Sequence, residues 1–352
     1  MRFCFQFFMF AVAAFSAFAE EFCGIIDSPI TWTEAGSPYY ITGDIQISHA
    51  ARLTIDSGAV VYIVPGESCG ETKQLDWSDS TGISIKAYGT LVIKGTAAKP
   101  VRILPVEHVP GKIQWDGIRL PYRDRSTVHI EYLHIMGASK AINASFSRFN
   151  LGNTLFESNG TGIWLENEGD LSVFNCIFTK NLSAGIYIKN SRPSIAANIF
   201  YKNSGFGIWS DSRPSPRIRN NIFFGNADTD CRFCPVGVST SKDTKDKFGN
   251  IYTDPIFKGS EAEEIMIKKD PNLPTPINEV KDQDLQKIYK ESKSAPPKPQ
   301  ASPLDSLPYR LSTYSPGLNA APKTSFFKNE KGNYDIGLYG GTPDRHNSSI
   351  SF

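Results

Sequence analysis

The chain has 352 residues and a formal net charge of +1. A near-neutral chain whose Lys and Arg form no basic cluster attracts polyanions weakly, so we expect no nucleic-acid partner. Its 28 glycines and 23 prolines are spread among many phenylalanines and tyrosines. That composition favours numerous short strands separated by turns.

The first 19 residues have the pattern of a secretory signal peptide. Arg2 supplies a positive charge, residues 5–18 are almost entirely apolar, and Ala17-Phe18-Ala19 forms a small-x-small cleavage site. The alternative is a membrane anchor, but this apolar run is shorter than the ~20 residues that cross a bilayer. We therefore expect a mature chain that begins at Glu20, has no membrane span, and is secreted, periplasmic or on the cell surface.

Residues 41–63, 83–103 and 113–135 each contain short runs in which apolar and polar residues alternate. Such alternation is typical of half-buried strands. Together these segments predict three early turns of a coil, of which the first two consist of three strands each.

Residues 151–226 repeat with a period of 22–23 residues. Four kinds of position recur together: Phe156, Phe178, Phe200 and Phe223; Asn159, Asn181, Asn203 and Asn226; Leu151, Val173, Ile195 and Ile218; Gly162, Gly185 and Gly207. Each period holds three short β-type runs, whereas a leucine-rich repeat of similar length needs regularly spaced leucines and a helical or extended convex side. The repeat predicts an all-β, three-faced parallel solenoid.

Stacked coils place equivalent residues above one another at about 4.8 Å, so each repeated position becomes a column. We expect the four repeated phenylalanines to form a single inward file, and corner asparagines to bond backbone groups that the turns leave unpaired. Further inward positions are Ile163, Leu165, Ile186, Ile188 and Ile208.

Five cysteines remain after the predicted cleavage site. Export favours disulfides, and we expect one between Cys23 and Cys69 and another between Cys231 and Cys234. A redox C-x-x-C motif is the alternative for the second pair, but such motifs precede a helix, and here Pro235 follows. Cys176 falls in the column of Thr154, Asn198 and Asn221, which predicts a buried free thiol.

The predicted β-helix spans residues 20–258. Residues 259–305 are rich in Lys, Glu, Asp and Pro, which indicates a polar insertion or linker that is partly disordered. We expect residues 306–352 to form a C-terminal segment that packs on the β-helix.

Several stretches are similar to a known superfold. The segments GDIQISHAARLTIDSGAVVYI and YGTLVIKGTAAKPVRIL, the run NIYTDPIF, and the C-terminal SPGLNAA and YDIGLYGG resemble secreted bacterial proteins with right-handed parallel β-helix repeats, the pectin-lyase-like superfold. The resemblance implies a right-handed helix and a bacterial source. It leaves activity open, because this fold hosts many functions.

An aromatic column is the first candidate site. Trp164, Tyr187 and Trp209 occupy equivalent outward positions on three successive coils, and we expect a flat apolar strip that binds glycan. The alternative is a structural ladder, either covered by another segment or packed across rungs to stabilise the sheet.

Beside it, Glu166, Lys189 and Asp211 form a column of alternating charge. The first interpretation of this column is a salt-bridged ladder. The alternative is a catalytic pair, because Glu166 and Asp211 are expected two rungs apart, at about the carboxylate spacing of an inverting glycosidase. Polysaccharide lyases of the resembled fold hold calcium with acidic residues and use Arg or Lys as base. No such set is evident in the sequence, so we expect no metal or other cofactor, and calcium only if the chain is a lyase.

These features favour a non-catalytic, monomeric β-helix protein that binds a polysaccharide or a cell-envelope protein through its aromatic face. The alternative is a polysaccharide lyase or glycoside hydrolase of pectin-lyase-like type. A purely architectural spacer in an envelope assembly is a third possibility.

Overall fold

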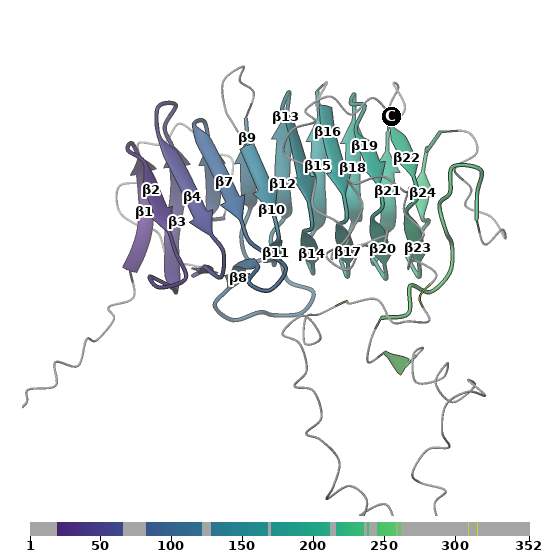
Figure 1. Ribbon diagram of the computed structural model, residues 1–352, viewed down its shortest axis with the longest axis horizontal. Helices are drawn as coiled ribbons and strands as arrows, with labels where there is room; N and C mark the ends of the chain where they lie inside the picture. Colours follow the sequence, from purple (N-terminus) through teal and green to yellow (C-terminus); the bar gives the residue numbers. More distant parts are fainter. Residues whose placement is uncertain are drawn as a thin grey trace, which may run out of the picture.

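The computed structural model describes residues 20–65, 82–121, 128–167, 170–211, 216–235 and 245–257, with the single positions 238, 260, 261, 309 and 315. In this part of the chain every named element is a β-strand, and the strands stack along one axis as a solenoid (Figure 1). The predicted signal peptide and nearly all of the predicted insertion and C-terminal segment lie outside the described residues.

Each coil contributes one strand to each of three faces. The first face consists of β3 (Tyr39–Ile47), β6 (Ser84–Ala87), β9 (Gly117–Leu120), β12 (Lys140–Ser145), β15 (Thr161–Glu166), β18 (Ala184–Lys189), β21 (Phe206–Ser210) and β24 (Cys231–Arg232). The second face consists of β2 (Ile30–Trp32), β4 (Arg52–Asp56), β7 (Thr90–Lys94), β10 (Val128–Glu131), β13 (Arg148–Gly152), β16 (Asp170–Phe174), β19 (Ser194–Ala196) and β22 (Arg217–Arg219).

The third face consists of β5 (Val60–Ile63), β8 (Val101–Pro105), β11 (Leu133–Met136), β14 (Leu155–Glu157), β17 (Ile177–Thr179), β20 (Ile199–Tyr201) and β23 (Ile222–Phe224). Strand β3 pairs with β5 through one half and with β6 through the other, so it joins the first and third faces into one 16-stranded sheet. Strand β1 (Glu20–Ile26) pairs with both halves of β3 and closes the N-terminal end of this sheet.

The phenylalanine file that the spacing predicts lies on the third face. Phe156, Phe178, Phe200 and Phe223 are paired in register on successive strands and are buried. Their rings stack nearly parallel with centroids 4.7, 4.9 and 4.8 Å apart. These spacings match the strand spacing of a sheet, so the rings fill the interior without gaps between coils.

The repeated glycines make room for this file. A Cβ atom at Gly185 would lie 2.8 Å from the ring of Phe200 and 2.7 Å from the carbonyl oxygen of Gly207. Gly162 and Gly207 meet the same obstruction one coil to either side. The column of glycines is therefore a packing requirement of the aromatic file.

The corners of the coils depend on residues in the left-handed region of the backbone. Such residues recur in columns: Asn153, Asn175, Ala197 and Asn220 between the second and third faces, Ser158, Lys180 and Lys202 after the third face, and Phe146, Asn167 and Asn190 between the first and second, all with φ between 49° and 59°. Asparagine tolerates this conformation better than most residues, which explains why it recurs at the corners.

Two ladders of buried asparagine side chains run along the axis inside the corners. In the first ladder the Nδ2 group of Asn181 donates to Oδ1 of Asn203 at 2.9 Å, while its Oδ1 accepts from the backbone N–H of Asn159 at 3.1 Å. In the second, the backbone N–H of Cys176 donates to Asn198, which continues to Asn221. These bonds satisfy backbone groups that a tight corner leaves unpaired.

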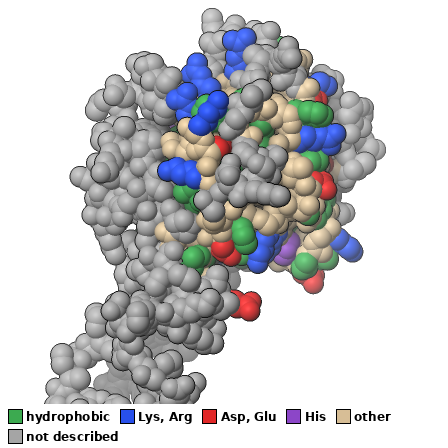
Figure 2. Space-filling model, turned by 90° about the vertical axis from the view of Figure 1, so that its right-hand side faces the viewer, with side chains coloured by type: hydrophobic (Ala, Val, Ile, Leu, Met, Phe, Trp, Pro, Cys, Tyr) green, Lys and Arg blue, Asp and Glu red, His purple; other side chains and the backbone are tan. Residues whose placement is uncertain are grey.

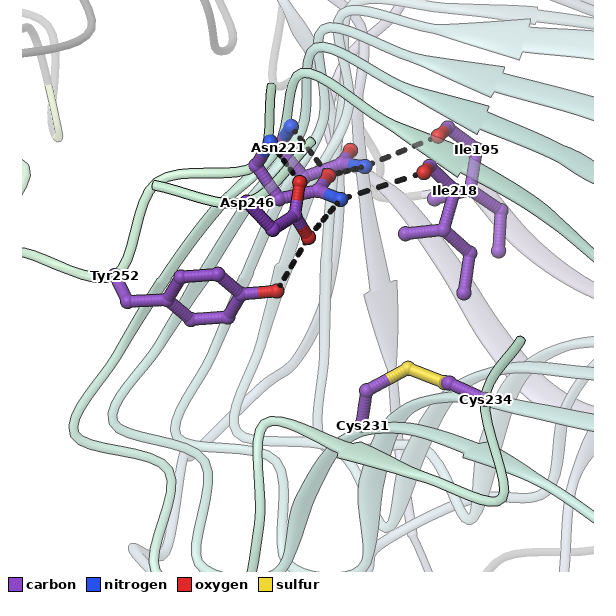
Figure 3. The surroundings of a disulfide bond; sticks show 8 residues. Ile195, Ile218, Asn221, Cys231, Cys234, Asp246 and Tyr252 are labelled. Carbon is purple, nitrogen blue, oxygen red and sulfur yellow. Dashed lines mark hydrogen bonds between the residues drawn. A yellow bond between two sulfur atoms is a disulfide. The ribbon is translucent and has the colours of Figure 1, made fainter. Parts of the chain in front are cut away.

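Both ladders end on an aspartate. Asn226 donates through Nδ2 to Oδ1 of Asp230 at 2.8 Å. Asn250 donates its backbone N–H and its Nδ2 group to the two oxygens of Asp246 at 3.0 and 2.9 Å. Tyr252 adds a hydrogen bond to Asp246 at 2.9 Å (Figure 3).

Aromatic residues cover both ends of the core. At the N-terminal end Trp32 is buried between Phe22 and Tyr39, with ring centroids 4.9 and 5.0 Å away. At the C-terminal end Tyr252 stacks on Phe223 at 5.6 Å. Viewed from the C-terminal end, the described hydrophobic and charged side chains are interspersed and form no single patch (Figure 2).

The sequence missed parts of this arrangement. It placed the first coil at residues 41–63, whereas in the structure β1 pairs with β3 and β2 pairs with β4 on the N-terminal side of that coil. It also predicted one run over residues 113–120, but β9 begins at Gly117 and Ile113 is exposed. The alternation of apolar residues did not mark this boundary, because it continues through residues that turn before the strand.

The aromatic file predicts a large cost for removing one ring. Phe178→Ala deletes a fully buried side chain between two stacked neighbours, and we expect it to lower the free energy of unfolding by about 3–5 kcal/mol. Leu182→Ala, at an exposed corner of the same coil, should change it by less than about 0.5 kcal/mol. Chemical denaturation measures both, and equal losses would contradict the packing described.

Candidate functional site

The predicted aromatic residues lie in one outward column of the first face. The strand register pairs Asn143 with Trp164, Trp164 with Tyr187, Tyr187 with Trp209, and Trp209 with Arg232. The neighbouring positions Ile163, Leu165, Ile186, Ile188 and Ile208 are buried in the core as expected. Alternation along the strands therefore places the three aromatic rings outside the helix.

The rings do not form the flat strip that the sequence predicted. Trp164 and Tyr187 stack on each other along the helix axis, with centroids 3.9 Å apart and planes inclined by 26°. Tyr187 and Trp209 meet edge to face at 5.2 Å and 90°. Tyr187 is consequently buried, whereas Trp164 and Trp209 are each partly exposed.

Basic residues flank the column at both ends. The ammonium group of Lys140 lies 3.7 Å from the ring centroid of Trp164, and the guanidinium of Arg232 lies 5.0 Å from that of Trp209. Both contacts are within the range of cation–π attraction. Burial lowers the pKa of Lys140, while Glu166 and Asp116 act in the opposite direction.

Tyr187 is fixed in place by a charged neighbour. Its hydroxyl donates to Oδ2 of Asp211 at 2.6 Å. Burial, the hydrogen bond to Asp211 and the negative charges of Asp211 and Glu166 together raise the pKa of Tyr187 to about 12. Tyr187 therefore stays a neutral donor, and Asp211 holds its ring between the two indoles.

Glu166, Lys189 and Asp211 do not form the salt-bridged ladder expected from the sequence. Glu166 and Lys189 are paired in register, yet none of the three forms an ion pair with another described residue. One oxygen of Asp211 is engaged by Tyr187. Within the described ranges, no group of three or more His, Cys, Asp or Glu side chains is placed to hold a metal ion.

A second polar cluster, which the sequence did not reveal, lies on the third face. Glu157 receives hydrogen bonds from Lys180 at 3.0 Å and from the hydroxyl of Tyr309 at 2.7 Å on one oxygen. Its other oxygen lies 3.1 Å from Nε2 of His134. Only Glu157 and Lys180 belong to the clear repeat, and Tyr309 lies far away in sequence, so no spacing signal identified the cluster.

The same face carries an apolar patch outside the main core. Leu155, Ile177, Ile199 and Ile222 form an outward column, yet they are buried. Phe257 packs on this patch and meets the ring of Tyr309 at 5.3 Å. Residues that follow the last coil thus cover part of the third face, and the Glu157 cluster anchors Tyr309 there.

The cysteines occupy distinct positions. Cys231 and Cys234 form a disulfide with Cα atoms 5.6 Å apart at the C-terminal end of the helix (Figure 3). Cys176 is a buried free thiol, and burial raises its pKa well above the usual range. Cys23 is disulfide-bonded, and its predicted partner Cys69 lies outside the described residues.

Comparison with known proteins supports the fold. Residues 111–247 match the family model of the right handed beta helix region. No curated protein and no solved structure gave a significant match. With the stacked parallel strands, the match identifies the chain as a right-handed parallel β-helix repeat protein.

In the described part of the chain, no helix has the length and apolar character needed to cross a bilayer.

The Glu157 cluster predicts a pH-dependent stability. Burial alone would raise the pKa of Glu157, but hydrogen bonds from His134, Tyr309 and Lys180 outweigh it and lower the pKa from 4.5 to about 2. A carboxyl group whose pKa is lower in the folded chain than in the unfolded chain stabilises the folded state when the pH is above its unfolded pKa. That contribution disappears as the pH falls from about 4.5 towards 2. It amounts to about 3 kcal/mol at neutral pH.

Glu157→Gln should therefore lose stability relative to the unmodified chain at pH 7, and the difference should shrink as the pH approaches 2. Asp56→Asn, which removes an exposed pair with Lys94 at 3.4 Å, serves as the control and should show a small difference throughout. Denaturation curves between pH 2 and 7 measure both variants. A Glu157→Gln difference that does not change with pH would contradict the assignment.

Proposed function

We propose that this chain is a non-catalytic β-helix protein whose first face binds a linear polysaccharide at Trp164 and Trp209. One observation carries the proposal: two partly exposed indoles stand in a single outward column, one rung on either side of a buried tyrosine. Two rungs of a sheet span about 9.6 Å. That separation is comparable to the length of a disaccharide, so alternate contacts with one glycan chain are geometrically reasonable.

The rigidity of the column supports binding. Tyr187 is buried and hydrogen-bonded to Asp211, and it separates the two indoles by packing against both. Side chains that are already ordered lose little conformational entropy when a ligand arrives. Lys140, Glu166 and Arg232 lie around the rings and offer polar groups to sugar hydroxyls, as carbohydrate recognition requires.

Two features that are typical of exported proteins support the same function. The predicted signal peptide and the disulfide between Cys231 and Cys234 are both consistent with an oxidising compartment. We infer that the protein is secreted, periplasmic or displayed at the cell surface, where polysaccharides are accessible. A monomeric scaffold is sufficient for this role, because a solenoid presents an extended face without a partner subunit.

Catalysis is not favoured by the arrangement of carboxylates. A paired-carboxylate mechanism would need one carboxyl group held protonated and a second free to activate water. Lys189 lies between Glu166 and Asp211 in the column, and Tyr187 engages one oxygen of Asp211. The Asp211 oxygen that Tyr187 engages is therefore not free to activate a water molecule.

Binding of a polysaccharide array tests the proposal. We expect the unmodified protein to bind at least one linear glycan, and the double variant Trp164→Ala/Trp209→Ala to lose about tenfold or more in affinity. Tyr62→Ala, which removes an aromatic ring from the third face where it meets Tyr40, is the matched control and should bind normally.

Retention of full affinity by the double variant, or absence of binding across the array, would overturn the proposal and favour an architectural role. Release of unsaturated products or new reducing ends from the bound glycan would show instead that the chain is an enzyme.

A further inference from the structure

A cavity of about 380 Å³ opens at the corner between the second and third faces, away from the aromatic column. It exists because corner lengths differ from coil to coil. Residues 95–100 join β7 to β8, whereas Tyr132 alone joins β10 to β11, and two residues join β13 to β14. The longer loop overhangs the shorter corners and supplies Ala97, Ala98 and Pro100 as one wall of the cavity.

The loop that forms this wall is held in place. Thr96 and Lys99 exchange backbone hydrogen bonds at 3.1 and 3.2 Å. The carbonyl oxygen of Lys99 also accepts a hydrogen bond from the N–H of Gly58 at 3.0 Å. The ammonium group of Lys99 forms an ion pair with Glu34 at 2.5 Å. The cavity is therefore formed before any ligand arrives, which reduces the cost of binding.

An unpaired amide lines the cavity. Asn153 is fully buried, and neither Oδ1 nor Nδ2 has a hydrogen-bond partner. Leaving such a group unpaired costs about 1–3 kcal/mol. The asparagines of the two inner ladders, by contrast, are bonded from coil to coil. Asn153 thus keeps an unused donor and an unused acceptor in the wall of the cavity.

An unpaired cation lies at the same cavity. Arg102 is exposed on β8 and forms no ion pair with another described residue. The nearby Lys99 is already neutralised by Glu34, so Arg102 carries the uncompensated positive charge of the cavity. Its planar guanidinium suits a carboxylate, which it can bind through two parallel hydrogen bonds.

His134 completes the polar wall. It sits beside Arg102 on the adjacent rung, and its Nε2 atom faces the carboxylate of Glu157 at 3.1 Å. An ionised carboxylate only accepts hydrogen bonds, so Nε2 of His134 carries a hydrogen and Nδ1 is left to bond a hydroxyl group of a ligand. No described residue bonds to Nδ1.

We propose that this cavity binds a small hydroxylated carboxylate. Arg102 takes the carboxylate, Asn153 and Nδ1 of His134 take hydroxyl groups, and Leu155 and the loop wall enclose the carbon skeleton. A neutral polyol leaves Arg102 without its partner, and an unsubstituted fatty acid leaves the buried amide of Asn153 unpaired. Both should therefore bind less tightly than a ligand that carries both groups.

Calorimetric titration of the full-length protein with gluconate, glucose, butyrate and glucose 6-phosphate tests this inference. We expect gluconate to bind with the highest affinity. Arg102→Gln should weaken gluconate at least about tenfold, because a charge-assisted pair is lost. Arg217→Gln, at an exposed arginine on the second face, is the matched control and should bind gluconate normally.

Asn153→Gly provides a second variant that tolerates the left-handed backbone at φ 52°. It should weaken gluconate but leave butyrate unchanged. Absence of gluconate binding to the unmodified protein, equal affinity for glucose or glucose 6-phosphate, or unchanged affinity in Arg102→Gln would each overturn the inference. The Trp164→Ala/Trp209→Ala variant should bind gluconate normally, so the outcome is independent of the polysaccharide site.

Discussion

The structure depends on the backbone hydrogen bonds that hold each coil directly above the preceding one. Parallel pairing in register converts a sequence period of 22–23 residues into columns of equivalent side chains. Every other feature follows from this alignment. The phenylalanine file fills the interior because its rings repeat at the strand spacing, and the asparagine ladders pair because each amide has an equivalent amide above it. A column is stable only where its side chains can stack on, or hydrogen-bond to, the side chains directly above and below them.

The same constraint shapes the outside of the molecule. Rings that are stacked along the axis contact one another before they can contact a ligand, which is why Trp164 and Tyr187 lie face to face. Tyr187 becomes a structural member of the column, and the indoles on either side keep part of their surface exposed. Where one corner is longer than its neighbours, as at residues 95–100, the columns are interrupted and a cavity results.

The sequence was sufficient for the repeated part of the fold. The spacings of Phe178, Asn181 and Gly185 predicted the solenoid and its inward residues, because repeated side chains report directly on repeated geometry. It also placed Trp164, Tyr187 and Trp209 in one outward column, but it did not predict how their rings would tilt, because the period reports the position of a side chain and not its rotamer. The cluster around Glu157 and the cavity at Asn153 escaped prediction for a different reason. They bring repeat residues such as Asn153 and Glu157 together with residues outside the clear repeat, such as His134 and Tyr309, and the period does not report those contacts.

The aspartates at the ends of the two ladders accept the last hydrogen bonds of each ladder. Each asparagine passes its amide hydrogen to the next coil, so the ladders have a direction and every new coil demands another acceptor. Asp230 and Asp246 supply that acceptor, and their carboxylates carry no side-chain amide hydrogen to pass on. They therefore end the two chains of side-chain hydrogen bonds at the last coils. A longer solenoid would need a further asparagine on its next coil to accept from Asn226 and from Asn250, and a new acceptor for the last asparagine of each ladder.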